Sequence, residues 1–180
     1  MIPVKILKIS YQPSTRNYYL VLKELDGDHC FPLTIGSSEA QSIALALESV
    51  EPTRPMTHDL ICKLLSEIDL SLKRVRITDI KDGVFYSYID IESKIFGKKE
   101  IDARPSDAIA IALRENAPIL VSKKLINYSG IDHKTFVDNN DKEKLGKLLK
   151  KLKLELRDAV RDENYEIAAE LRDKIKKIDH

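Results

Sequence analysis

The sequence is poor in cysteine and lacks the cysteine and histidine spacing that is typical of a metal site. Its 180 residues include two cysteines, Cys30 and Cys62, and four scattered histidines. These residues do not follow the spacing of a structural zinc site, which excludes a zinc-binding module of that kind. We expect two half-buried thiols in a reducing cytoplasm, with a disulfide between them as the less favoured alternative.

Long hydrophobic runs are also absent from the sequence. No apolar stretch approaches the roughly 20 residues that a helix needs to cross a bilayer, which excludes an ordinary membrane-spanning protein. The N-terminus, Met1-Ile2-Pro3-Val4-Lys5, lacks the basic segment and apolar core of a signal peptide. We therefore expect a soluble protein of the cytoplasm.

The chain has no excess of charge of one sign. It contains 30 lysine and arginine residues against 29 aspartate and glutamate residues, so its formal net charge is +1. No global positive field would attract nucleic acid, and any such binding must use a local patch. The composition therefore argues against a protein that coats nucleic acid, but it is compatible with an enzyme that holds one strand in a cleft.

The pattern of apolar residues predicts strands and helices up to about residue 131. Hydrophobic residues make up 43% of the chain, which is typical of a globular protein. Alternating apolar positions predict strands over residues 2–11, 17–25, 31–35, 72–80, 85–91, 99–103 and 118–121. Helical spacing predicts helices over residues 38–49, 57–68 and 105–116, and a short turn of helix over 122–127.

This order of elements predicts an α+β domain over residues 1–131. The domain would contain a mostly antiparallel or mixed sheet with helices on one face. Hairpin turns are expected at Asp26-Gly27-Asp28 and Lys81-Asp82-Gly83, because Asp-Gly favours the positive φ of such turns. A polar linker is expected over residues 132–143.

Three short polar clusters lie where a strand or a proline-rich link leads into a predicted helix. They cover residues 35–40, 54–60 and 101–108. Capping accounts for part of the pattern: Ser38 and Thr57 suit N-cap positions, and Ser38 with Gln41 has the spacing of a capping box. Capping does not explain the basic residues that accompany the acidic ones, which are Arg54, His58 and Arg104.

A functional interpretation treats the three clusters as the rim of one site for phosphodiester chemistry. Helix N-termini present free N–H groups that bind phosphate, and arginine binds phosphate through two parallel hydrogen bonds. Carboxylates can hold a divalent cation, and His58 can transfer a proton near neutral pH. Phosphodiester cleavage needs charge neutralisation, an activated water and a protonated leaving group. The sequence alone does not show that the clusters meet in space.

In these clusters the chain resembles the bacterial bifunctional nuclease domain over residues 1–131. The resemblance rests on Ile35-Gly36 with Glu39-Ala40, on Arg54-Pro55 with Thr57-His58-Asp59-Leu60, and on Asp102 with Arg104-Pro105-Ser106-Asp107-Ala108-Ile109-Ala110. Asn116-Ala117-Pro118-Ile119 fits a turn at which the family often has glycine, and asparagine suits a left-handed cap. The resemblance implies cleavage of RNA and DNA phosphodiester bonds, assisted by a divalent metal.

The site implied by the resemblance has three sets of residues. The predicted catalytic residues are Glu39, His58, Asp59, Asp102 and Asp107. Phosphate binding is expected from Arg54, Arg104 and Ser106. The predicted metal ligands are Glu39, Asp59 and Asp102, with Mg²⁺ or Mn²⁺ as the ion.

From Lys144 onward the apolar residues follow a narrow helical seam. The first predicted helix carries Leu145, Leu149, Leu152, Leu156 and Ala159, and the second carries Tyr165, Ala168, Leu171, Ile175 and Ile178. The short turn at residues 161–164 makes the two helices antiparallel. The residues that resemble the UVR motif of UvrB and UvrC are Ala159-Val160, Glu163-Asn164-Tyr165-Glu166, Ala168-Ala169, Leu171-Arg172-Asp173 and Ile175. This resemblance implies protein association.

A hairpin of this size buries too little surface to be very stable alone, so its apolar seam needs cover. The cover would come from its own domain, from the same hairpin in a second copy or from another protein. Two less favoured alternatives are nucleic-acid binding through its lysines and a solvated tail with nothing bound.

The leading hypothesis is a nuclease-type enzyme that acts on RNA or DNA, forms a homo-oligomer and carries a UVR hairpin over residues 144–180. The hairpin would serve self-association or recruitment. The alternative is a non-catalytic adaptor or regulator in which the polar clusters only cap helices. The two hypotheses differ in whether Glu39, Asp59 and Asp102 face one cleft.

Overall fold

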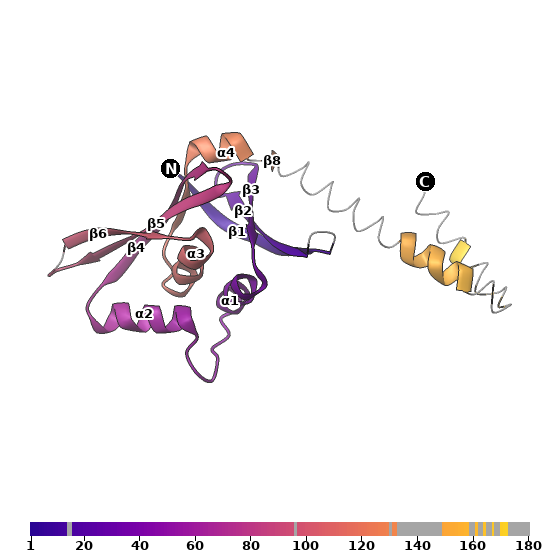
Figure 1. The fold of residues 1–180 in the computed structure, drawn as a ribbon, viewed down its shortest axis with the longest axis horizontal. Coiled ribbons are helices and arrows are strands. Elements are labelled where there is room, and N and C mark those ends of the chain that lie inside the picture. The colour runs from indigo at the N-terminus through magenta and orange to yellow at the C-terminus, as the bar shows by residue number, and fades with distance from the viewer. Residues whose placement is uncertain are drawn as a thin grey trace. The chain divides into compact units, whose positions relative to one another are not determined.

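The computed structural model describes residues 1–13, 16–95, 97–129, 131–132, 149–158, 161, 164, 167 and 170–172. These residues belong to two compact units, Met1–His133 and Lys134–His180. The first unit holds a sheet and four helices (Figure 1). Among the described residues, no helix is long and apolar enough to cross a membrane. Cys30 and Cys62 are not joined by a disulfide, as expected, but Cys30 is fully buried and only Cys62 is half-buried.

The first unit is built on one mixed sheet, which confirms the predicted α+β class. Its eight strands follow the order β6-β5-β4-β7-β1-β2-β3-β8. Their bounds are Ile2–Gln12 for β1, Asn17–Glu24 for β2, His29–Ile35 for β3, Ser71–Lys81 for β4, Val84–Ser93 for β5, Gly97–Ala103 for β6, Ile119–Val121 for β7 and Ile131–Asp132 for β8. The sequence does not predict β8, because two residues are too few for a periodic pattern.

A three-residue strand joins the two halves of the sheet. Strands β1–β3 form one antiparallel meander and β4–β6 form a second. Between them lies β7, antiparallel to β1 and parallel to β4, so that Ile119 is paired with both Val4 and Val75. All three of these side chains are buried. The short β7 therefore unites two locally folded meanders over one core.

Both predicted hairpins are present, but only one has the predicted turn geometry. Asp82 and Gly83 have positive φ angles of 50° and 78°, as a two-residue turn between β4 and β5 requires. The turn between β2 and β3 has no residue of positive φ among those described, so the Asp-Gly argument is wrong for Gly27.

Four helices accompany the sheet, and each matches a predicted helix. They are α1 Ser37–Leu47, α2 Thr57–Glu67, α3 Pro105–Arg114 and α4 Lys123–Ser129. The first three end one or two residues earlier than predicted, because Ser49, Asp69 and Asn116 adopt positive φ angles of 52°, 53° and 51°. The left-handed cap expected at Asn116 is thereby confirmed.

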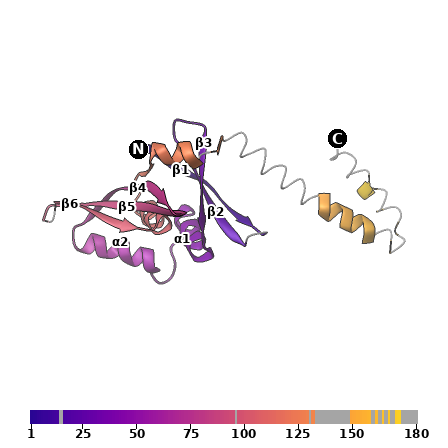
Figure 2. The same ribbon diagram turned by 45° about the horizontal axis from the view of Figure 1, so that its top comes forward.

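Helix α3 is the middle of a helical layer that also contains α1 and α2. It packs against α1, α2, β4 and β5. Helix α4 lies at the opposite end of the unit from α1 and α2, where it contacts β3 and β4 (Figures 1 and 2). The single layer predicted from the sequence therefore describes α1, α2 and α3.

The predicted caps of α1 and α2 are wrong by one or two positions. Gly36 is the N-cap of α1, so Ser38 lies inside the first turn and cannot form a capping box with Gln41. Met56, rather than Thr57, is the N-cap of α2. In both helices the residue that the sequence suggested as a cap has helical geometry instead.

Helices α3 and α2 differ in how deeply they are buried. Helix α3 contributes five consecutive buried residues, Ala108–Ala112. Helix α2 contains no buried residue. Leu60 and Leu64 on α2 and the following Ile68 are 51%, 55% and 53% exposed. Full burial therefore fixes α3 in the core, whereas α2 packs on the core through partly buried residues such as Ile61 and Cys62.

In the second unit, residues 149–158 are helical, in agreement with the first predicted helix of the hairpin. The turn and most of the second predicted helix lie outside the described residues, as does most of the predicted linker 132–143. The antiparallel hairpin therefore stays a prediction.

Replacing Phe31 by alanine should destabilise the first unit by about 3–5 kcal/mol. Phe31 is 1% exposed, and its ring meets the edge of the Phe85 ring at a centroid distance of 5.5 Å. The exposed Val84, 58% accessible, provides the control. Val84→Ala should cost less than about 0.5 kcal/mol. Urea denaturation followed by circular dichroism measures both, and equal losses would contradict the assigned core.

Candidate active site

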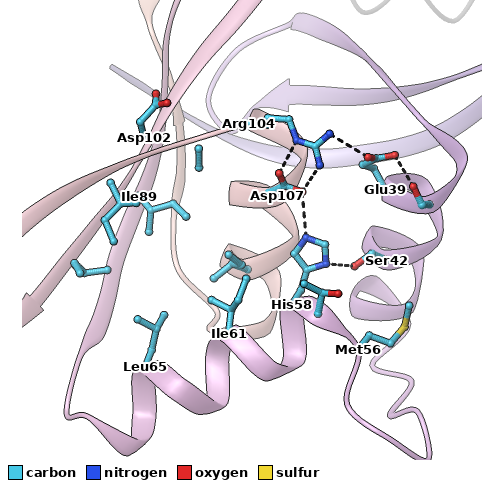
Figure 3. Close-up of a pocket in the computed structure, with 16 residues that line it drawn as sticks. Glu39, Ser42, Met56, His58, Ile61, Leu65, Ile89, Asp102, Arg104 and Asp107 are labelled. Atoms are coloured by element: carbon cyan, nitrogen blue, oxygen red, sulfur yellow. Dashed lines mark hydrogen bonds and ion pairs between the residues drawn. The ribbon is translucent and has the colours of Figure 1, made fainter.

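The N-terminal ends of α1, α2 and α3 meet around one pocket of about 610 Å³. Its polar side is formed by Glu39 of α1, His58 of α2, and Arg104 and Asp107 at the start of α3 (Figure 3). Three clusters that lie far apart in the sequence therefore meet in space. This arrangement goes beyond what separate helix caps require.

A continuous chain of hydrogen bonds and ion pairs crosses this polar side. Ser42 Oγ lies 2.8 Å from His58 Nδ1, and His58 Nε2 lies 3.3 Å from Asp107 Oδ1. The Arg104 guanidinium donates to both oxygens of Asp107, from Nε at 2.7 Å and from Nη2 at 3.1 Å. Its Nη1 lies 3.4 Å from Glu39 Oε1. The chain thus links all three helices, as Figure 3 shows.

The charge on Asp107 determines where the protons lie in this chain. Burial opposes ionisation of Asp107, but the hydrogen bonds from Arg104 and His58 outweigh it and lower the pKa of the carboxyl. An ionised Asp107 is an acceptor only, so it accepts a hydrogen bond from the N–H of His58 Nε2. In the neutral ring Nδ1 is then the acceptor, and Ser42 Oγ donates to it. His58 therefore presents an N–H group, and not a lone pair, to the carboxylate beside it.

Glu39 is the second carboxylate that holds Arg104. Its own backbone N–H and the Ser38 hydroxyl, which donates at 2.9 Å, lower the pKa of Glu39. The side chain of Arg104 is 68% exposed, whereas those of Glu39 and Asp107 are 19% and 28% exposed. A solvated cation is therefore held at the pocket by two less exposed anions.

A second polar cluster joins the same helices behind the pocket. Arg114, in the last turn of α3, donates from Nε to Asp59 Oδ1 at 2.5 Å. From Nη1 it donates to the carbonyls of Ser42 and Ala110 at 3.3 Å and 2.9 Å. Asp59 also accepts the Met56 N–H at 2.8 Å, which caps α2. The side chains of Arg114 and Asp59 are 11% and 20% exposed, so this clamp is largely shielded from water.

The structure separates the predicted site residues into two groups. It brings Glu39, His58, Arg104 and Asp107 together. Asp59 instead lines a different pocket. Asp102 lies at the rim of the first pocket, where its exposed side chain stands apart from the hydrogen-bonded chain (Figure 3).

Two of the predicted phosphate ligands also lie outside the polar cluster. Arg54 is exposed in the link between α1 and α2, and Ser106 lies in the first turn of α3. Neither residue lines the pocket that contains His58. Of the three predicted phosphate ligands, the pocket therefore contains Arg104.

The predicted metal ligands do not form one site in this structure. Glu39, Asp59 and Asp102 do not converge, because Arg114 holds Asp59 away from the pocket. Within the part of the chain that the structure describes, no three histidine, cysteine, aspartate or glutamate side chains are grouped so that they could hold a metal ion. The donor set therefore does not fit the predicted three-carboxylate arrangement.

Sequence reasoning missed Ser42 and Arg114. Ser42 is 2% exposed and lies beside the buried Ile43. A serine within the apolar stripe of a helix indicates a buried hydroxyl that needs a partner, and this pattern could have identified it. Arg114 follows the apolar run of α3 and suits the last turn of a helix, where a cation is ordinary. Its role depends on partners 55 and 72 residues away, which no local pattern reveals.

Two family models match different parts of the chain. The model of the bifunctional nuclease domain matches residues 20–134, and the model of the UvrB/uvrC motif matches residues 146–180. The first match contains every residue of the polar cluster described above. The second match begins within the second unit.

Individual relatives match part of the chain. An uncharacterized protein of Mycobacterium tuberculosis is 41% identical over 128 residues, which cover 71% of this chain and 76% of the relative. Bifunctional nuclease 1 of Oryza sativa subsp. japonica is 28% identical over 122 residues, covering 66% of this chain and 37% of the plant protein. Bifunctional nuclease 1 of Arabidopsis thaliana is 28% identical over 116 residues, covering 62% of this chain and 35% of the Arabidopsis protein.

Replacing Arg114 by methionine should reduce the stability of the first unit by about 2–4 kcal/mol at pH 7, because it leaves the carboxylate of Asp59 shielded and unpaired. The hydrogen bond from Arg114 holds the pKa of Asp59 below its ordinary value of 3.8. A lowered folded-state pKa means that this stabilisation is present above about pH 4 and is lost as the pH falls further. Urea denaturation measures the free energy of unfolding of wild type and Arg114→Met at pH 7 and pH 3. The difference between the two proteins should therefore be smaller at pH 3.

The matched control is Arg74→Met. Arg74 lies 2.6 Å from Asp90, but its side chain is 52% exposed. Asp90 is shielded, but Arg76 also donates to both of its oxygens, so removal of the half-exposed Arg74 leaves the carboxylate paired and this variant should stay within about 1 kcal/mol of wild type. If Arg114→Met lowers the free energy of unfolding no more than the control does, the proposed role of Arg114 as a clamp is contradicted.

Proposed function

The chain belongs to the bifunctional nuclease domain family, and on this premise we propose that its first unit cleaves phosphodiester bonds of RNA and DNA. The observation that carries the proposal is Asp107, which contacts both a histidine and an exposed arginine at one pocket. A phosphate ligand and a proton-transfer pair are the protein groups that such hydrolysis needs. The rice and Arabidopsis relatives named as bifunctional nucleases support the same reaction class.

Arg104 would bind the phosphate of the substrate. Its guanidinium is already at the pocket and is 68% exposed, so it can turn from Glu39 and Asp107 toward an entering anion. Arginine recognises phosphate through two parallel hydrogen bonds, which fix its orientation as well as its position. The carboxylates would hold the arginine in place until the substrate arrives.

Asp107 and His58 would then share the proton transfers. A water molecule attacks phosphorus, and its proton passes to Asp107 as the new P–O bond forms. The P–O bond to the leaving oxygen breaks, and that oxygen takes a proton from the doubly protonated, imidazolium form of His58, because donation from the neutral ring would leave an imidazolate. The proton on Asp107 then passes to His58, which restores the starting state. The existing 3.3 Å contact between the two residues supports this return.

The movement of Arg104 would also adjust the basicity of Asp107. In the free protein the hydrogen bonds from Arg104 and His58 lower the pKa of Asp107 against the effect of burial. When Arg104 turns to the phosphate, the pKa of Asp107 rises because the remaining burial favours the protonated form. Substrate binding would thus make the carboxylate a better base at the moment when it is needed.

A divalent metal has no assigned role in these steps, because the predicted ligands do not converge. The cleavage assay nevertheless tests whether the reaction needs a metal. Glu39, Asp102 and Asp107 outnumber Arg104 at the pocket, so a divalent cation would strengthen the binding of phosphate that Arg104 provides. We expect faster cleavage in Mg²⁺ or Mn²⁺ than in EDTA.

A second candidate function is a non-catalytic adaptor or regulator that acts through the C-terminal unit. The observation that favours it is the closed hydrogen-bond chain at the pocket, in which both ring nitrogens of His58 already have partners. Such a network can serve to join α1, α2 and α3 without any reaction.

Asp107→Asn should reduce cleavage of single-stranded RNA and DNA about 10²- to 10⁴-fold, which is the usual contribution of general acid–base catalysis. The full-length protein is assayed with end-labelled oligonucleotides in Mg²⁺, Mn²⁺ or EDTA. The matched control is Asp79→Asn, because Asp79 on β4 bonds Ile80 and Lys124 outside the pocket. Its rate should stay within about twofold of wild type, since such surface changes are small.

Equal residual activity in wild type, Asp107→Asn and the control would indicate a contaminating nuclease and reject the enzyme. Thermal unfolding of each variant checks that the pocket is still folded. Rates in EDTA equal to those in Mg²⁺ and Mn²⁺ would reject the expected metal requirement while leaving the steps at Asp107 and His58 in place.

We also propose that the UvrB/uvrC motif mediates self-association or recruitment. Deletion of residues 141–180 should convert a homo-oligomer into a smaller species, measured by light scattering coupled to gel filtration. If the deleted protein forms an oligomer with the same number of subunits, the interface lies in the first unit and the motif serves another partner.

A further inference from the structure

The pocket has an apolar half that the proposed proton transfers do not use. It is formed by Ile61 and Leu65 from the middle of α2, by Ile89 of β5 and by Ile101 of β6. Figure 3 shows Ile61, Leu65 and Ile89 on the side of the pocket away from Glu39 and Ser42. We call these four residues the apolar slot.

The apolar slot has two walls of regular geometry. Ile89 and Ile101 are paired directly across the β5–β6 ladder, so their side chains lie on the same face of the sheet. Ile61 and Leu65 are four residues apart on α2 and therefore share one face of the helix. Ile101 is 45% exposed, and Ile61 and Leu65 are partly exposed. The slot is therefore a surface open to a flat apolar ligand.

We propose that the apolar slot binds the base of a nucleotide whose phosphate is held by Arg104, and that it makes the site selective for single-stranded RNA or DNA. The inference rests on the proposed function and names the substrate form of that same site. A nucleotide joins an anionic phosphate to a flat ring with apolar faces. The pocket has the complementary division, with an exposed arginine beside one half and aliphatic side chains in the other.

The same division argues against a protein as the occupant. A second copy of the chain or a partner helix would cover the half-exposed isoleucine and leucine side chains equally well. Neither of these occupants would explain why two carboxylates hold the exposed Arg104 side chain at the end of the apolar slot. The combination of charge and apolar surface therefore favours the nucleotide.

Single-strand selectivity follows from the depth of the apolar slot. Ile89 at its floor is only 7% exposed, so the base must enter between the strands and α2 to reach it. A base in a duplex is stacked and paired, and it must be taken out of the helix at a free-energy cost before it can enter a pocket. An unpaired strand avoids most of that cost.

The test compares binding of natural and abasic oligonucleotides to full-length protein. The two probes are a single-stranded octanucleotide that carries 2-aminopurine and an octamer of the same backbone without bases. Binding is measured by 2-aminopurine fluorescence for the first and by competition against it for the second, in EDTA. Ile101→Asn and Leu65→Gln each alter one wall of the slot. Ile95→Asn is the matched control, because Ile95 is 75% exposed near the same two strands and does not line the pocket.

The expected result is a loss of affinity of about 5- to 10-fold for the natural strand with Ile101→Asn or Leu65→Gln, as for one lost apolar contact. Binding of the abasic strand should be unchanged, and the control should match wild type with both probes. Duplex DNA of the same sequence should bind more weakly than the single strand.

Each of three results would overturn the proposal. The first is an equal effect of Ile101→Asn and Ile95→Asn on the natural strand. The second is an equal loss of affinity for natural and abasic strands. The third is a change of oligomer mass in Ile101→Asn with unchanged binding, which would assign the apolar slot to contacts between copies.

The outcomes also separate this inference from the proposed reaction. Base-dependent binding without any cleavage by wild type would keep the apolar slot and reject the nuclease. Cleavage by wild type that Ile101→Asn and Leu65→Gln leave unaltered in KM and kcat would keep the nuclease and reject the slot.

Discussion

The geometry of the pocket depends on one shielded arginine. Arg114 ends α3, which is fixed in the core by five consecutive buried residues, and reaches α1 through the Ser42 carbonyl and α2 through Asp59. Helix α2 has no fully buried residue and packs on the core through partly buried residues such as Ile61 and Cys62, so burial fixes the position of His58 only weakly. A shielded ion pair contributes little net stability, but its hydrogen bonds have defined directions. The clamp therefore supplies the position of the helix, and the sheet and α3 supply the stability.

Two aspartates in these helices form ion pairs that differ in exposure to water. The shielded pair holds the structure together, and the exposed pair is available to a ligand. Asp59 and Asp107 each pair with an arginine at hydrogen-bond distance. The arginine side chain that meets Asp59 is 11% exposed, and the one that meets Asp107 is 68% exposed. Water competes for the second pair, so an entering anion can replace the carboxylate there at small cost. The same type of contact is thus permanent at one end of α3 and exchangeable at the other.

The sequence predicts the elements well because each has a local cause, and it predicts the site less well because its contacts are not local. Alternation and helical spacing locate the strands and helices, and the three polar clusters locate Glu39, His58, Arg104 and Asp107. Asp59 was grouped with His58 because the two are adjacent in sequence. Adjacent residues on a helix point about 100° apart, however, and the two side chains meet different helices. The partners of Arg114 lie 55 and 72 residues away in the sequence, so they depend on how the helices pack together, which no local pattern reveals.

On the proposal that a base occupies the apolar slot, binding and catalysis share helix α2. Ile61 and Leu65, which would contact the base, lie on the same helix as His58, which would protonate the leaving oxygen. A bound base would cover apolar side chains that the free protein leaves partly exposed, and a ligand that binds the docked helix stabilises that position. Contacts remote from the phosphorus would thereby help to fix the position of the proton donor. Binding energy used in this way raises the rate of reaction and not the affinity alone. A helix that lies on the core through partly buried residues and is held by polar contacts is suited to this role, because a fully buried helix would gain less from the substrate.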